Sequence, residues 1–184
     1  RRQRMAVVIS SFDSPGNPHY GGGGANMVEM IARWLAAEFE VTVVTAARRG
    51  GTSVRDGVRY RQLPVGWAGP RAGQLLFHAL LPFVAWRMSH DLWIESFTPP
   101  FSTSLLPLFS RARVVGFAQN LSGEEMWTRY RLPFFLIERF GLRFYRDVVV
   151  LNLADRIRVC RYSPSAAVRV IPNCVDLPVP YEWL

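Results

Sequence analysis

The sequence of 184 residues predicts an α/β protein built on a doubly wound parallel sheet. Short runs rich in β-branched residues alternate with stretches whose apolar residues recur at helical spacing. The clearest example is residues 5–46, which predict a strand, a glycine-rich turn, a helix and a second strand. Such a unit brings backbone N–H groups and a helix N-terminus together, and this arrangement suits a bound phosphate.

The elements of this first unit follow from local composition. Residues 5–10 form an uninterrupted apolar run, typical of a strand buried on both faces. The helix is predicted by apolar residues at i, i+3, i+4, i+7 and i+8, namely Met27, Met30, Ile31, Trp34 and Leu35. Residues 40–45 are β-branched and predict the second strand.

The rest of the chain repeats the alternation. Further strands are expected over residues 58–63, 91–95, 113–117, 147–151 and 168–171. Further helices are expected over residues 75–90, 101–109, 134–145 and 154–161. Polar, Gly- or Pro-rich loops are expected over residues 47–53, 64–73 and 119–131. Ligands of such sheets bind beyond the carboxyl ends of the strands, so the loops there are the candidate site.

The charge balance limits the partners. The net charge is +8, and all 22 basic residues are arginine. The arginines are dispersed and not interleaved with aromatics, which argues against nucleic acid and leaves an anionic membrane surface or a phosphorylated ligand. Residues 75–86 are too short to span a bilayer. A core-facing helix is favoured there over a membrane-surface helix. Trp67 and Trp86 are expected in the core, with a lipid-facing or sugar-stacking surface as the alternative.

The number and spacing of the cysteines and histidines predict a reducing compartment and no metal site. Cys160 and Cys174 have neither metal-ligand spacing nor a disulfide framework, so we expect a cytoplasmic protein. The three histidines are dispersed, so no metal is expected.

Common nucleotide motifs do not fit the glycine block. Met27 stands where a dinucleotide fingerprint needs its third glycine, and no acidic residue follows the second strand. Arg48 or Arg49 could accept a 2′-phosphate, so an NADP-dependent oxidoreductase fragment stays an alternative. A P-loop and a hydrolase elbow are both missing from the sequence. A free-standing Rossmann-like ligand-binding module is a second, non-catalytic alternative.

Three strings resemble the N-terminal domain of retaining glycosyltransferases of family 4, which have the GT-B fold. The first is Gly23-Gly24 before a helix, followed by the strand string FEVTV (residues 39–43). The second is VVGFAQNLSGEEMW (114–127), and the third is VIPNCVD (170–176). The resemblance implies a Rossmann-like acceptor-side domain over residues 1–176 and the start of an interdomain linker over 177–184. It also implies a second, donor-binding domain that is absent here, so the isolated chain is expected to be inactive.

The resemblance also implies partners and roles. The partners are a nucleotide sugar as co-substrate and an acceptor hydroxyl on a lipid-linked, natural-product or glycan molecule, with peripheral contact at the inner face of the membrane. No cofactor or metal is implied. Gly23 and Gly24 would approach the donor phosphate, although a plain tight turn is the alternative. Arg48 and Arg49 would meet an anionic acceptor or stay solvated.

The remaining candidates lie in the loops after the first and fifth strands. Tyr20, Asn120 and Glu124 would bind the acceptor; the alternatives are loop hydrogen bonding for Asn120 and a solvated charge for Glu124. Gln119 stands where the family usually has His, and its amide cannot titrate. A proton-transfer role would then fall to Glu124 or to Asp13, whose alternative role is capping.

Overall fold

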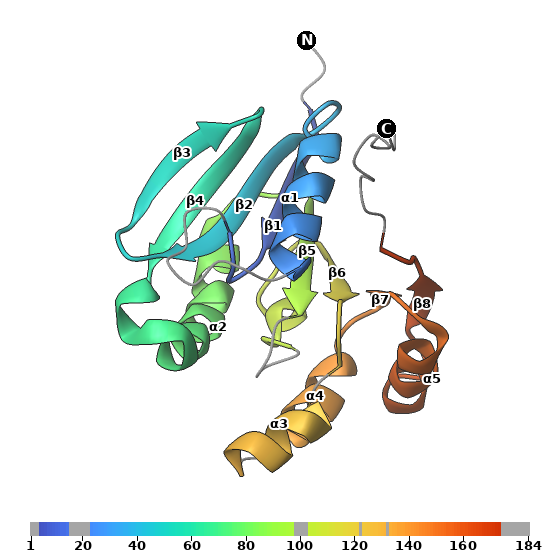
Figure 1. Cartoon of the computed structure of the whole chain (residues 1–184). Coiled ribbons are helices and arrows are strands. Elements are labelled where there is room, and N and C mark those ends of the chain that lie inside the picture. The colour runs from blue at the N-terminus through green and yellow to red at the C-terminus, as the bar shows by residue number, and fades with distance from the viewer. Residues whose placement is uncertain (1–3, 15–22, 98–102, 122, 132, 174–184) are drawn as a thin grey trace, which may run out of the picture.

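The computed structural model describes residues 4–14, 23–97, 103–121, 123–131 and 133–173, and these form one eight-stranded sheet flanked by helices (Figure 1). The spatial order is β3-β4-β2-β1-β5-β6-β7-β8. The strands are β1 (Ala6–Ser10), β2 (Glu40–Ala47), β3 (Gly51–Arg55), β4 (Val58–Pro64), β5 (Leu92–Phe97), β6 (Arg113–Ala118), β7 (Asp147–Val150) and β8 (Ala167–Val170). The helices are α1 (Gly23–Leu35), α2 (Gly69–Arg87), α3 (Gly123–Tyr130), α4 (Phe134–Leu142) and α5 (Leu153–Tyr162), with 3₁₀ turns η1 (Gly66–Ala68) and η2 (Leu106–Leu108).

The predicted parallel sheet is confirmed, with one exception at its edge. Neighbouring strands are parallel from β4 across to β8, with Val8 of β1 in register with Thr42 on β2 and with Trp93 on β5. Strand β3 is antiparallel to β4 and covers part of the predicted loop 47–53. The turn Asp56-Gly57 has positive φ at both residues, which matches the twist of a tight hairpin.

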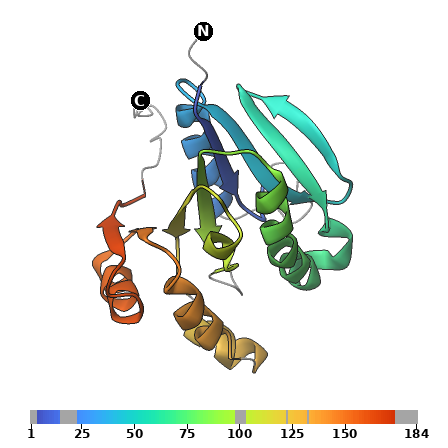
Figure 2. The same cartoon turned by 180° about the vertical axis from the view of Figure 1, so that it is seen from behind.

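The helices cover two faces of the sheet. Helix α1 packs on β1 and β2 through Val28 and Ala32. Helix α2 packs on the other face through Phe77, Leu81 and Ala85, together with parts of α4 and α5. Figures 1 and 2 show α1 and α2 on opposite sides of the strands. This arrangement follows from the strand order, because right-handed crossovers toward β3 and toward β8 must use opposite faces.

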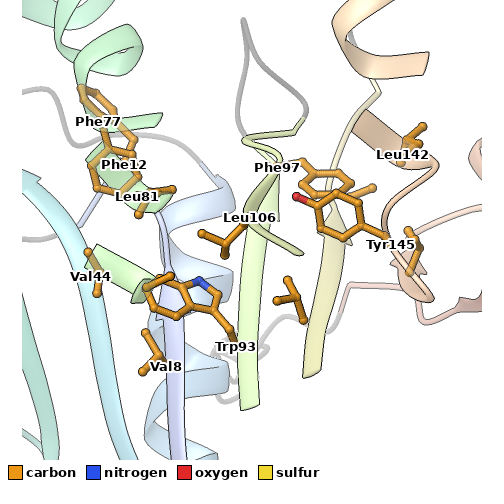
Figure 3. Packing of buried hydrophobic residues seen from close by; sticks show 14 of the residues in the cluster. Val8, Phe12, Val44, Phe77, Leu81, Trp93, Phe97, Leu106, Leu142 and Tyr145 are labelled. Carbon is orange, nitrogen blue, oxygen red and sulfur yellow. The ribbon is translucent and has the colours of Figure 1, made fainter. Parts of the chain in front are cut away.

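The larger core is built around Trp93, which is completely buried between β1, β2 and the helical layer. Figure 3 shows it beside Val8, with Tyr145 facing Phe97 further along the sheet. The Trp93 indole donates to the Ser10 hydroxyl (2.9 Å), so its one polar group is satisfied inside the core.

The expected helix over residues 101–109 is wrong where the structure describes it. Only η2 is helical, because Leu105 has a left-handed backbone (φ 58°) that ends any continuous α-helix at that point. Residues 101 and 102 lie outside the described residues.

Two expected loops are partly helical. Residues 64–73 contain η1 and the start of α2, which begins at Gly69 with Pro70 in its first turn. Residues 119–131 contain α3, whose first N–H group, on Gly123, donates to the buried carboxylate of Glu138 on α4 (3.0 Å). Trp127 of α3 also packs edge-on against Phe135 of α4. Both contacts are made between two different helices, so the local composition of residues 119–131 did not indicate them.

Candidate active site

The candidate site is the carboxyl edge of the sheet, where residues that follow β1, β2 and β6 lie beside the end of β5, and where Gln119 contacts the start of α1. The segment after β1 is fixed there, since the amide of Ala46 and the hydroxyl of Thr45 both donate to the carbonyl of Phe12 (3.2 and 3.1 Å). This contact holds the carboxyl ends of two central strands together, so residues that follow them are held near one edge.

Gln119 connects three elements at this edge. It follows β6 and is half-buried. Its Nε2 donates to the backbone carbonyl of Gly24 at the start of α1 and to the hydroxyl of Ser96 on β5, both at 3.1 Å. Both amide hydrogens are thus directed at protein acceptors, which fixes the orientation of the side chain. Its Oε1 lies against the backbone of Gly24.

The two glycines at the start of α1 differ in their surroundings. A Cβ on Gly24 would overlap the Gln119 amide oxygen, so the close approach of these two residues requires glycine. A Cβ on Gly23 would meet no described atom within 4 Å. The first turn of α1 carries no acidic residue of its own, and the positive end of a helix dipole favours an anion.

Asp13 lies just beyond β1 and is half-buried. The Ser11 hydroxyl donates to its backbone carbonyl (3.0 Å), which fixes the chain at this point. Tyr20, His19 and the glycines before Gly23 lie outside the described residues. The structure places Asp13 at the predicted edge. The role of Tyr20 stays a prediction, because this residue is not among those described.

Arg48 and Arg49 follow β2 at the same edge, as expected for residues after a central strand. Both are exposed, and with Ala47 and Gln62 they line a hollow of about 570 Å³. A hollow lined by two cations suits a negatively charged group.

Glu124 lies in the first turn of α3 and is mostly exposed. Its carboxylate lies 3.9 Å from Arg139 of α4 and 4.0 Å from Arg158 of α5. Exposed pairs at such distances contribute little to stability. The structure thus directs Glu124 toward the helices α4 and α5, whereas Gln119 contacts α1 and β5. Asn120, next to Gln119, is exposed at the edge.

A buried carboxyl group that sequence reasoning missed lies under this edge. Glu95 precedes Ser96 on β5, and alternation along the strand directs the two side chains to opposite faces. Its carboxylate accepts from the backbone N–H of Ser104 (3.0 Å) and from the hydroxyl of Tyr145. Burial raises the pKa of Glu95 from 4.5 to about 7, against the opposing effect of these hydrogen bonds. A lone Glu in the otherwise apolar strand was the available signal.

Within the described residues there is no cluster of three His, Cys, Asp or Glu side chains suited to a metal. Over the same part of the chain, every helix is too short or too polar to cross a bilayer.

The sequence model of Glycosyltransferase Family 4 matches residues 21–178. The chain belongs to Glycosyltransferase Family 4. The match includes Gly23, Gly24, Gln119 and the string at residues 170–176 that carried the resemblance, while Asp13 and Tyr20 precede it. The family assignment and the fold make the chain a glycosyltransferase domain with the Rossmann-like architecture of a GT-B half.

A solved structure agrees with this family fold. The α,α-trehalose-6-phosphate synthase from Burkholderia multivorans superposes with a TM-score of 0.53 at 13% sequence identity. The superposition covers 88% of this chain and 42% of that enzyme, so the chain spans less than half of the enzyme's length. At this identity the likeness concerns the fold alone. A search of curated protein sequences gave no match.

Proposed function

We propose that this family 4 domain is the acceptor-side half of a retaining glycosyltransferase, which transfers a sugar from a nucleotide-sugar donor to an acceptor hydroxyl. The observation that carries the proposal is the junction of Gln119, Gly24 and Ser96. It joins the glycine turn to the carboxyl edge of the sheet, where ligands of such folds bind.

In this proposal the start of α1 faces the diphosphate of the donor. As the bond to the anomeric carbon breaks, negative charge develops on the leaving phosphate. Backbone N–H groups and the positive end of the α1 dipole stabilise that charge. No described atom lies within 4 Å of the position that a Cβ on Gly23 would take, which supports close approach of a phosphate to the backbone there.

Gln119 acts in the proposal as a positioning and hydrogen-bonding residue. An amide does not titrate, so Gln119 cannot remove the proton of the acceptor hydroxyl. Its Oε1 accepts a hydrogen bond from a sugar hydroxyl while Nε2 stays bound to Gly24 and Ser96. Asp13, at the same edge, is then our candidate for proton transfer.

The acceptor lies over the remaining loops of the edge. Asn120 and Tyr20 bind its hydroxyls, and Glu124 lies at the outer boundary of the surface that binds the acceptor. Arg48 and Arg49 meet an anionic group on the acceptor, which fits the hollow that they line. The donor is shared with a second domain, and we expect residues 1–176 alone to be inactive and to need no metal or cofactor.

Substitution of Gly23 tests the donor role. In the complete protein encoded by the gene, Gly23→Ala should leave the melting temperature near that of the wild type, since the new methyl group meets no described atom. It should nevertheless lower nucleotide-sugar turnover about tenfold or more, because a Cβ separates the phosphate from the backbone. Ser165→Ala is the control, because Ser165 is exposed in the turn before β8, at the amino edge of the sheet opposite the proposed site.

Calorimetric titration with UDP-sugars, GDP-sugars and NADP separates the alternatives, both for the chain and for the complete protein. Binding of a nucleotide sugar by the complete protein, with weak binding by the chain, supports a shared donor site. If the complete protein binds no nucleotide sugar, the non-catalytic binding module replaces the proposal, and binding of NADP alone indicates the oxidoreductase alternative. Unchanged turnover in Gly23→Ala would exclude the phosphate contact.

A further inference from the structure

Helix α2 has a second apolar face that the core does not use. Phe77, Leu81 and Ala85 face the sheet and are buried. The opposite stripe, at spacings of three and four residues, is exposed and apolar, and consists of Leu75, Leu76, Ala79, Leu80, Phe83 and Trp86. This corrects the expectation of a helix that is simply core-facing, because a helix that is apolar all round is normally buried on all sides.

A further exposed tryptophan, Trp67, lies in η1 just before the start of α2. Its side chain is 70% exposed, and those of Phe83 and Trp86 are 60% and 59% exposed. The expectation that Trp67 and Trp86 belong to the core is therefore wrong. Figures 1 and 2 show that no described helix lies against the outer side of α2. We call η1 and the stripe the α2 surface.

The sequence that contains the α2 surface carries basic residues and no acidic ones. Residues 57–90 contain no Asp or Glu. Arg71 and Arg87 lie near the two ends of α2 and are exposed. The backbone of Arg48 lies against Gly66 of η1, so the pair Arg48–Arg49 adjoins the same surface. An apolar stripe that includes Trp86 and has an arginine near each end of the helix is complementary to an anionic bilayer surface.

We propose that the α2 surface docks on an anionic lipid bilayer. Trp67, Phe83 and Trp86 enter the headgroup and acyl boundary, and the flanking arginines contact anionic headgroups. The helix lies in the plane of the interface, since no described helix is suited to cross a membrane.

The position of α2 gives this docking a consequence for the candidate site. Helix α2 follows β4, whose last residue is in register with Ala47 at the end of β2. The start of α2 and Arg48 therefore lie at the carboxyl edge that holds the candidate site. Docking would place that edge beside the bilayer. This last step rests on the proposed function, whereas the docking itself does not.

Vesicle co-sedimentation of the 184-residue chain tests the proposal. Vesicles of pure phosphatidylcholine are compared with vesicles containing 30 mol% phosphatidylglycerol, a composition of about one anionic lipid in three. We expect binding to the anionic vesicles at least about tenfold stronger, weakening as salt is added. Arg87→Glu should weaken it by about fivefold or more, the effect of one basic side chain near such a surface.

Matched triple variants test the apolar contribution. The variant Trp67→Ser, Phe83→Ser, Trp86→Ser should lose binding by about tenfold or more. The control replaces three equally exposed apolar residues on α1 and α5 by serine, namely Trp34, Leu153 and Ile157 (68%, 64% and 71% exposed), and should bind as the wild type does. Far-UV circular dichroism establishes that both variants are folded.

Three outcomes would overturn the proposal. The first is absence of binding to the anionic vesicles, and the second is equal loss of binding in the two triple variants. The third is a concentration-dependent dimer that the α2 triple variant abolishes while vesicles stay unbound, which would make the α2 surface a protein interface. Each outcome leaves the nucleotide-sugar titrations unaffected, so failure here is distinguishable from failure of the proposed function.

Discussion

The buried carboxyl group of Glu95 makes a specific prediction about the pH dependence of stability. Its pKa rises from 4.5 to about 7 on folding, chiefly because burial disfavours the charged form. The folded chain therefore holds this proton more tightly than the unfolded chain does. The resulting stabilisation is fully present below pH 4.5, falls as the pH rises, and is lost above about pH 7. Replacement by the neutral isostere in Glu95→Gln should remove this dependence.

The magnitude follows from the two pKa values. A gap from 4.5 to about 7 corresponds to about 3 kcal/mol of unfolding free energy in full, of which roughly 2–3 kcal/mol is lost between pH 5 and pH 8. The Gln amide oxygen can still accept from the N–H of Ser104, and its NH₂ group can donate to the Tyr145 hydroxyl, so the packing is preserved.

The assay is urea unfolding of the wild type and Glu95→Gln at pH 5 and pH 8. His78 acts in the opposite sense: burial lowers its pKa from 6.5 to about 4, so its stabilisation is present above pH 6.5 and lost as the pH falls toward 4. This contribution is the same in both proteins and cancels in their difference. That difference should change by roughly 2–3 kcal/mol between the two pH values, or about 1 M or more in urea midpoint. A pH-independent difference would refute the reasoning.

Two further substitutions probe packing and helix capping. A Cβ on Gly116 would lie 2.5 Å from Cζ of the buried Phe97, so Gly116→Ala should cost about 1–3 kcal/mol through overpacking, measured as a lower urea midpoint. An unchanged midpoint would mean that the ring moves aside without cost. The Asn152 side chain accepts from the backbone N–H of Asp155 (2.8 Å) and caps α5. Asn152→Ala should cost about 1 kcal/mol and Asn152→Ser much less, and equal melting temperatures for the two variants would contradict the capping role.

Local pattern determined the fold class and most of the elements. The strands β1 and β2 and the helix α1 were predicted within a few residues. A strand buried on both faces has a continuous apolar run, and a helix packed on a sheet has apolar residues at helical spacing, so both can be recognised from the sequence. The glycine pair and Gln119 were singled out as well, since both follow from the motif order that resembles the family. The carboxyl edge as the place of the site followed from the parallel sheet alone.

Elements fixed by distant partners could not be predicted in this way. Helix α3 depends on the Glu138 carboxylate at its first turn, and the expected helix near Pro107 stops at the left-handed Leu105. The position of Glu95 in an apolar strand was the one local sign of a second buried carboxyl group, but composition did not indicate that Tyr145 and Ser104 would enclose it.

The tertiary structure alone decided which candidates meet and which faces stay exposed. Gly24 and Gln119 lie 95 positions apart, and the local sequence of neither residue indicates the hydrogen bond that joins them. The sequence showed that α2 is apolar. It could not show whether one or both apolar faces of the helix are buried, because the pattern of apolar residues is the same in the two cases. The exposure of a helix face depends on which other elements pack against it, and only the tertiary structure determines that packing.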